Sequence, residues 1–520
     1  MKKVILFTTI LFIFPHFLLS QGALDALRYA RNIYSGTARS AAIGNAVTAL
    51  GGDFGSLVIN PAGSAVFPYS EFIFTPALHV SSTKSDYLSN SSDEGYGRLG
   101  ITNIGYVAPL KLSNYSGITG ISFGVGYNAL NNFTDRISMS GVVDHLQEPS
   151  SWLASLASKT NGYRATDMDW YEGQNPFYSS YAPWRALLAW NTSLLDTIPG
   201  SGGREYLGAT EALFGNQIGI PGSLRQEFNR KSFGNVGEYL FNFALNISQR
   251  FFVGFNLGIQ SIYYETRENF SESAVNPNDF YQTQFNYFSH SYYQKTVGTG
   301  VNFKVGAIFL PIDNLRLGAS ISTPTWINLN EEWEESITAH FSDGYHQSLT
   351  SPLGQYEYKV KAPFRWNVGV AYTFGSLGAI SVDYEQVAYD KIFMSSKESN
   401  TNNPFSDENS YITKEFTRAS NFRAGLELNL NQDFSLRGGY AFYGNPEKSY
   451  GDNTQIASLG IGLHWGSFFS DLTFMQQFAQ KENFSLYDNV MEGAQIVYQA
   501  PAGSQNASNW KVLMSIGFRF

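Results

Sequence analysis

The chain has 520 residues, a net charge of −9 and no cysteine. The acidic balance argues against a nucleic-acid partner, because proteins that bind nucleic acids present basic surfaces. The lack of cysteine excludes disulfides, thiolate nucleophiles and a lipid anchor on an N-terminal cysteine. Charged residues make up only 15% of the chain, against roughly 25% in soluble domains.

Residues 1–20 have the features of a secretory signal peptide. Lys2 and Lys3 form a basic start, Val4–Leu19 is apolar, and cleavage is expected after Ser20. The apolar run is short for a transmembrane helix, and no other stretch approaches the length that such a helix needs. Export, few charges and many aromatic residues together favour a barrel in the bacterial outer membrane.

Residues 21–67 are rich in small side chains, as in "GTARSAAIGNAVTALGGD", which is followed by "SLVINPAGSAVF". Small side chains allow close approach of the backbone, so a compact segment of this kind suits the lumen of a barrel. Asn60 precedes Pro61 and is therefore held out of the α region. We predict a lumenal hatch in which Asn60, Pro61 and Ala62 set the junction with the first strand.

Alternation with a period of two residues recurs from Tyr69 to the end of the chain, as in "RWNVGVAYTF" and "KVLMSIGFRF". One face carries large apolar residues and the other carries Arg, Lys, Asn and Gly, as expected for lipid-facing and lumenal faces. Short and long connections also alternate, as in outer-membrane barrels.

We predict an all-β fold, namely a 14-stranded antiparallel transmembrane β-barrel over residues 68–520 with an N-terminal lumenal hatch and long extracellular loops. An even number of strands lets the barrel close without an unpaired edge in lipid. The predicted strands are 69–81, 98–108, 117–128, 238–248, 251–267, 290–310, 314–324, 360–374, 378–390, 414–430, 434–444, 454–466, 468–480 and 507–520.

The connection 129–237 is too long for a structureless loop. Two segments in it, 184–196 and 205–215, have helical apolar patterns. An apolar groove in this loop could capture a hydrophobic ligand; alternatively, the loop packs on itself as a cap. The candidate groove residues are Trp184, Leu187, Leu188, Trp190 and Leu195.

Three arginines, Arg365, Arg423 and Arg437, fall on the polar face of predicted strands. A lumenal arginine can hold a ligand carboxylate. The alternative is that these arginines pair with lumenal acids such as Asp383, Glu385 or Glu427.

No catalytic residue, metal or cofactor is predicted. The histidines form no metal-ligand spacing, and the sequence contains no nucleophile elbow. Four acids within "NEEWEE" (330–335) are expected in an outer loop, either as a solvated segment or as a calcium site.

The segment "ARSAAIGNAVTALGGD", followed by "INPAG" and an aromatic strand, resembles the N-terminal part of the FadL family of outer-membrane transporters for hydrophobic compounds. Residues 363–374 and 421–443 are similar to C-terminal hairpins of that family, and the resemblance covers 36–520. It implies passive transport of ligands such as long-chain fatty acids, captured by outer loops and passed to a lumenal pocket beside the hatch. It also implies lateral release where strand 3 kinks inward.

Strand 3 would be "GITGISFGVGYN", and interior glycines favour bulges and kinks. Gly120 and Gly124 are therefore candidate gate residues. Alternatively, the glycines only relieve crowding under the hatch.

The expected partners are a hydrophobic small molecule, outer-membrane lipid and the barrel-assembly machinery, whose clients end in an aromatic residue like Phe520. A monomer is expected. Fatty acids, aromatic hydrocarbons and haem-like ligands remain open as substrates. A different function is that of a non-transporting FadL-like scaffold or shuttle in a secretion system; a general porin is a third, against which the hatch argues.

Overall fold

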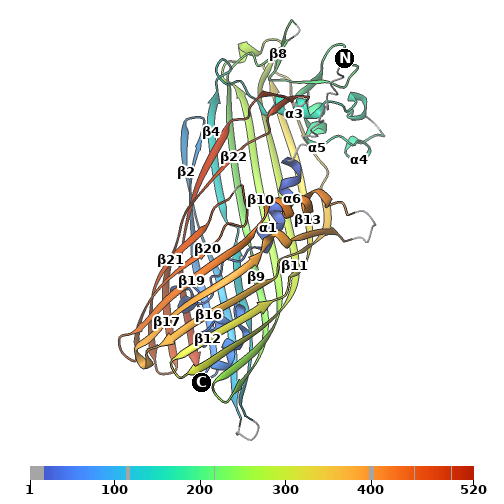
Figure 1. The fold of residues 1–520 in the computed structure, drawn as a ribbon. Helices are drawn as coiled ribbons and strands as arrows, with labels where there is room; N and C mark the ends of the chain where they lie inside the picture. The colour runs from blue at the N-terminus through green and yellow to red at the C-terminus, as the bar shows by residue number, and fades with distance from the viewer. Residues whose placement is uncertain are drawn as a thin grey trace, which may run out of the picture.

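The computed structural model describes residues 17–112, 117–171, 173–215, 217–397, 403–449, 451–493 and 495–520. Within them, fourteen antiparallel strands close into a barrel when the last strand pairs with the first (Figure 1). Four of the fourteen are interrupted and count as two elements each. In chain order they are β1 (Glu71–Tyr87), β2 (Asn90–Lys111), β3 (Ile118–Asn132) with β4 (Asp135–Val143), β9 (Leu224–Ile247), β10 (Phe251–Ala274), β11 (Phe285–Ile312), β12 (Leu315–Ser322) with β13 (Trp326–Phe341), β15 (Gly354–Lys361) with β16 (Arg365–Thr373), β17 (Gly378–Ala388) with β18 (Phe393–Ser396), β19 (Arg418–Asn429), β20 (Phe434–Tyr443), β21 (Thr454–Trp465), β22 (Phe468–Ser485) and β25 (Ala502–Arg519). The predicted fourteen-stranded barrel is confirmed.

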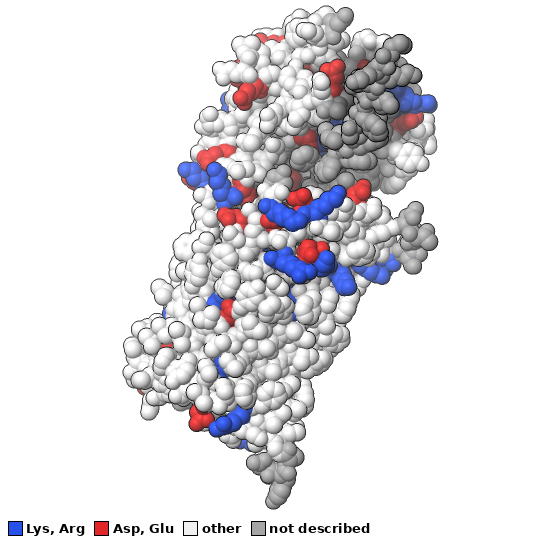
Figure 2. Space-filling model, in the orientation of Figure 1, with Lys and Arg blue, Asp and Glu red and all other residues white. Residues whose placement is uncertain are grey.

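The barrel is much taller than a membrane requires, since β9 and β10 have 24 residues each and a membrane strand needs about 9–11. On the outer face of β10, the exposed residues are apolar from Phe251 to Ile259, and the exposed Arg267 lies higher on the same strand. Figure 2 shows few charges below mid-height and many at and above it. The lower half therefore suits lipid and the upper half suits water.

Helices lie inside the barrel and on one side of its upper half (Figure 1). No helix in the described part of the chain is long and apolar enough to cross a membrane. The predicted signal segment lies mostly outside the described residues, and the first described helix begins within it. The helices are α1 (Phe17–Ala30), α2 (Ala38–Ala42), α3 (Trp152–Thr160), α4 (Pro176–Ser179), α5 (Trp184–Asn191) and α6 (Ser406–Glu415), with 3-10 turns η1 (Phe54–Val58), η2 (Pro61–Val66), η3 (Ala165–Asp167), η4 (Pro277–Phe280), η5 (Gly375–Leu377) and η6 (Tyr389–Lys391).

Residues 37–66, which we call the plug, fold as short capped turns inside the lower barrel. Thr37 caps α2 by accepting from Ser40 N, and Asp53 caps η1 by accepting from Gly55 N at 2.8 Å. Such short turns need these caps because their first N–H groups have no partner within the helix.

Inward-facing glycines of the wall make room for the plug. A Cβ on Gly105 of β2 would overlap the ring of Phe54, and one on Gly318 of β12 would overlap the backbone of Thr48. The same holds for wall glycines on seven further strands: Gly126, Gly254, Gly306, Gly369, Gly425, Gly439 and Gly460. The plug thus packs against bare backbone around the lumen.

The structure shortens the predicted outer loop, because strands continue to Val143 and resume at Leu224, leaving residues 144–223 as the insert. Residues 184–191 are helical as predicted. Residues 205–215 are not, because their two apolar ends each join a small hairpin. The remaining short strands are β5 (Leu195–Thr197), β6 (Tyr206–Gly208), β7 (Ala212–Phe214), β8 (Gln217–Gly219), β14 (His346–Thr350), β23 (Val490–Glu492) and β24 (Gln495–Tyr498).

The acids of 330–335 lie on β13, so their placement in an outer loop was wrong. Alternation along the strand sends Glu331 and Glu335 to the inside, where Glu331 accepts from Tyr358 and Glu335 from His290. Within the described residues, no group of three or more His, Asp or Glu side chains could hold a metal.

Candidate functional site

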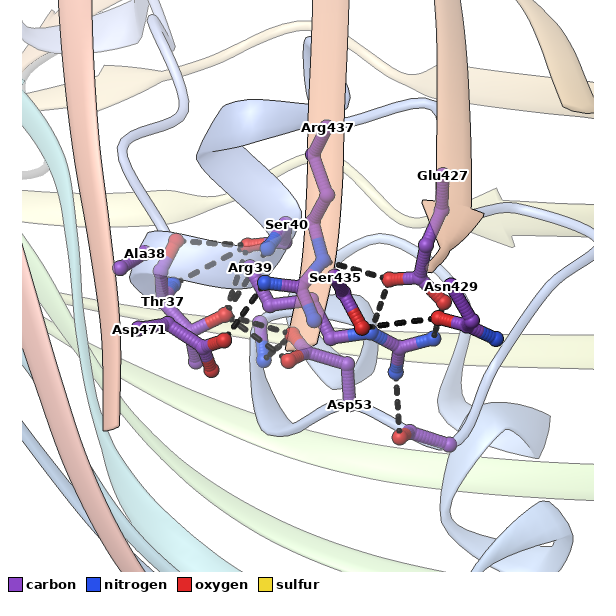
Figure 3. A network of polar contacts seen from close by, with 12 residues as sticks. Thr37, Ala38, Arg39, Ser40, Asp53, Glu427, Asn429, Ser435, Arg437 and Asp471 are labelled. Carbon is purple, nitrogen blue, oxygen red and sulfur yellow. Dashed lines mark hydrogen bonds and ion pairs between the residues drawn. The ribbon is translucent and has the colours of Figure 1, made fainter. Parts of the chain in front are cut away.

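The interface between the plug and the wall is held by buried ion pairs (Figure 3). Arg437 of β20 donates to Glu427 at 2.6 Å and to Asp471 at 2.5 Å, and Arg39 of the plug donates to Glu427 at 2.8 and 3.0 Å. Glu427 therefore joins a wall arginine to a plug arginine. Removing one partner of such a buried set would leave an uncompensated charge.

A second set lies on the neighbouring strands. Arg423 of β19 is fully buried; it donates to Asn367 at 2.8 Å and lies 3.4 Å from Glu385. Asp383 of β17 accepts from the backbone N–H and the hydroxyl of Thr48 at 2.8 and 2.6 Å. In this state Arg423 and Arg437 thus have acidic partners, as in the pairing alternative.

Arg365 lies higher than the other two arginines and borders a small polar cavity. It donates to the carbonyl of Ala30, while its Nη1 has no hydrogen-bond partner among the described residues and lies 3.9 Å from Glu385. Asn302 and Lys304 also line this cavity, which has room for about one water molecule. Arg365 thus also has Glu385 within ion-pair distance, and it borders a cavity.

Residues 30–34, which we call the strap, cross the lumen directly above the plug. Ile33 N donates to Leu130 O of β3 at 2.7 Å, and the Tyr34 hydroxyl donates to Glu385 of β17 at 3.0 Å. The strap therefore connects two opposite parts of the wall.

The wall is discontinuous where the strap meets β3. Leu130 is a bulged residue, since Ala129 and Asn131 pair with consecutive residues of β9. The ladder between β2 and β3 runs only up to the pair Asn103 and Asn128, and above it β4 pairs with β9. We call this break between β2 and β3 the window.

Aromatic rings close the window from the inside. The rings of Tyr29 and Phe133 are 6.1 Å apart, those of Phe133 and Tyr264 are 5.7 Å apart, and Arg28 lies 4.2 Å above the Tyr264 ring. Tyr29 and Arg28 belong to α1, which leads into the strap. The N-terminal segment thus supplies part of the closure.

The candidate gate glycines lie lower on β3 than the window. A Cβ on Gly124 would lie 2.9 Å from Leu57 of the plug, and one on Gly120 would lie 3.3 Å from Leu110 O. Gly124 thus lies against the plug, whereas Gly120 lies against the wall. Asn60 and Ala62 lie within the plug, where Asn60 Oδ1 accepts from Ala62 N at 3.1 Å and Pro61 opens η2.

Three of the candidate groove residues lie in the interior of the insert, and Trp184 and Trp190 are partly exposed and pack against its core. Leu187 and Leu188 are completely buried, and Leu195 is nearly so. Trp184 contacts Trp333 of the barrel at 5.8 Å between ring centroids. They belong to one apolar core that fills the extracellular mouth. Further members of that core are Trp152, Leu153, Leu156, Phe177, Phe270, Phe285, Phe288 and Tyr487.

Polar contacts anchor this insert, which we call the cap, to the barrel. Arg185 of α5 and His290 each lie 2.8 Å from Glu335. Burial is the largest single influence and opposes the charge of Glu335, but Arg185 and His290 together outweigh it and lower the pKa of Glu335 to about 2. Near α3, Glu272 accepts from Trp152 N at 2.7 Å, and its burial raises its pKa to about 7.

Sequence reasoning missed the strap, the window and the cap anchors. The signal for the window was weak, since one bulged residue breaks alternation by a single position. The signal for the plug contacts was present, because glycine recurs on the polar face of many strands.

No protein-family model matches the chain, and no curated protein sequence matches it significantly. Solved structures do. The toluene transporter TodX of Pseudomonas putida has 13% identity and a TM-score of 0.51, covering 94% of this chain and 99% of its own. A Pseudomonas aeruginosa FadL homologue has 10% identity and a TM-score of 0.54, covering 94% and 100%. The chain therefore has the fold of the FadL-type barrels, as the N-terminal resemblance implied.

Proposed function

We propose that this protein is a passive outer-membrane transporter of hydrophobic small molecules, such as long-chain fatty acids or aromatic hydrocarbons. The observation that carries the proposal is the window beside the strap, which interrupts the wall where the apolar outer surface ends. The structural relatives described as a toluene transporter and a FadL homologue support the same class of ligand.

Release is lateral, through the window between β2 and β3. Leu99 and Ile101 of β2 border it and are 77% and 50% exposed on the outside, while Tyr29 and Phe133 cover it on the inside. A hydrophobic ligand leaving there passes these apolar side chains and enters lipid directly, which reduces the cost of hydration.

The described state is closed, because the apolar core fills the mouth and the cavity below the strap is too small for a ligand. Ligand capture therefore involves the cap, including Trp184 and Trp190, which are partly exposed. The strap then moves, and Arg365 exchanges the carbonyl of Ala30 for the ligand's polar end. The plug below stays fixed through its ion pairs, with Asn60, Pro61 and Ala62 setting its position.

We also propose how the protein reaches the outer membrane and in which form it works. Residues 1–20 are removed near Ser20, and the barrel-assembly machinery recognises the terminal Phe520. The protein works as a monomer surrounded by outer-membrane lipid.

A disulfide across the strap tests the transport proposal. The chain has no cysteine, so the variant Ile33→Cys/Leu130→Cys introduces one defined pair next to the bond from Ile33 N to Leu130 O. We expect cells with the oxidised variant to take up labelled oleate and toluene no faster than cells lacking the barrel, and reduction to restore uptake. The single variant Ile33→Cys is the control. Uptake through the oxidised pair at the wild-type rate would contradict this route.

One observation favours the scaffold alternative, namely the filled extracellular mouth. A scaffold would show no uptake of either compound by wild-type cells, in oxidising or reducing medium. The same assay therefore separates the two functions.

A further inference from the structure

Three neighbouring strands are interrupted at the same height, where the apolar outer surface ends. The breaks are residues 323–325 between β12 and β13, 362–364 between β16 and β15, and 389–392 between β17 and β18. The strands on either side stay in register, since Lys361 pairs with both Trp326 and Phe393 across the top of the break.

Aromatic side chains mark the upper limit of the apolar surface here. Trp326, Phe364 and Phe393 are 48%, 42% and 48% exposed. Exposed aromatic rings at this position are typical of the boundary between acyl chains and headgroups. Lys361 stands between two of these rings, so its ammonium group lies at headgroup height.

Positive charge collects beside these rings, which contrasts with the net charge of −9 for the whole chain. Four cations form what we call the basic patch: Lys359, Lys361, Lys391 and Arg418. Asp390 lies 3.3 Å from Lys391 and 3.7 Å from Arg418 and so is shared between them. In the part of the chain that the structure describes, Lys359 and Lys361 are exposed and have no acidic partner within ion-pair distance.

The surroundings of Lys359 add neutral hydrogen-bonding groups. Lys359 pairs with Asn328 on one side and Ser395 on the other, so all three side chains share the outer face. The nearby acid Glu357 is engaged by Lys397. Amide, hydroxyl and ammonium donors side by side suit a phosphate group, which offers several acceptor oxygens. Figure 2 shows Lys and Arg gathered at this mid-height level.

We propose that the basic patch binds the phosphate groups of the outer-leaflet glycolipid, whose acyl chains lie against Trp326, Phe364 and Phe393. The ligand is a lipid and not free phosphate, because the charges stand at the edge of an apolar surface that fits acyl chains. This site goes beyond the transport proposal and does not depend on it.

Native mass spectrometry of the detergent-purified full chain with bisphosphorylated lipid A tests the proposal. We expect Lys359→Gln/Lys361→Gln to bind about 30-fold more weakly than wild type, at about fivefold for each charge near a lipid surface. Raising the salt concentration should weaken wild-type binding, because these contacts are electrostatic. Dephosphorylated lipid A should bind both proteins equally weakly.

The matched control is Lys84→Gln/Lys481→Gln, which removes two exposed lysines that lie on either side of Asn506 in the upper wall. This control should bind like wild type, and the heat-dependent gel shift of folded barrels should be the same for all three proteins. Equal lipid binding by the patch variant and wild type would overturn the proposal. So would competition by inorganic phosphate at the concentration of the lipid, which would point to a free-phosphate site.

Discussion

At the scale of single residues, Asn60 connects two segments of the plug to each other and to the barrel wall. Its Nδ2 donates to Thr48 O at 2.6 Å and to Ala307 O of the wall at 3.1 Å, and its Oδ1 accepts from Ala62 N. Asn60 is fully buried, so these groups would have no water to replace a lost partner.

Asn60→Ala should loosen the plug by about 2–4 kcal/mol, since it leaves buried carbonyls and an N–H group unsatisfied. Hydrogen exchange of residues 37–66 should speed up accordingly. Asn328→Ala on the exposed outer face is the control and should leave plug exchange unchanged. A protected plug in Asn60→Ala would show that Asn60 does not hold it.

The wall glycines can be tested on a single strand. Gly105→Ala should destabilise the plug by about 1–3 kcal/mol, because the added methyl overlaps the Phe54 ring. Gly95→Ala, also on β2, meets nothing within 4 Å and should be neutral. Limited proteolysis of the plug reports the difference. If both variants resist protease equally, the ring has space that the structure does not show.

At the scale of elements, the two ends of the cap respond to pH in opposite directions. Glu335 has a pKa lowered to about 2, so its stabilisation of α5 is complete above its ordinary value near 4.5 and is lost as pH falls toward 2. Burial also lowers the pKa of His290. Below the ordinary histidine pKa of 6.5, protonation of His290 therefore favours detachment of α5 from the barrel wall. Glu272, with a pKa raised to about 7, stabilises α3 below 4.5 and loses this effect as pH rises through 7.

Hydrogen exchange, corrected for intrinsic rates, should therefore show 151–153 loosening between pH 5 and pH 8 and 184–191 loosening below pH 5. Glu272→Gln should abolish the first change, because the amide does not ionise, and leave the second intact. The opposite pattern would come from Glu335→Gln. A single common pH profile for both segments in wild type would contradict the assignment.

At the scale of the whole molecule, the sequence predicted the barrel better than the site. Period-two alternation is strong where one face meets lipid, so all fourteen strands could be found. Above the membrane both faces are mixed, as in "RQEFNRKSFGNVG" (225–237), so the pattern does not distinguish the upper strands from loop. The apolar pattern of 184–196 cannot distinguish an exposed groove from a buried core. Similarly, the lumenal position of Arg423 does not distinguish an arginine that holds a ligand from one that pairs with Asp383 or Glu385.

The position of the plug has a consequence for assembly order. The last strand contributes to the plug site, because Ser515 Oγ of β25 accepts from Ala38 N and contacts Thr75 of the first strand at 2.7 Å. Glycines on β2, β3, β10, β11 and later strands surround the rest of the plug. A plug placed after closure would have to pass the filled mouth or the periplasmic turns. The plug residues can therefore reach their final packing only when β25 pairs with β1 and the barrel closes around them.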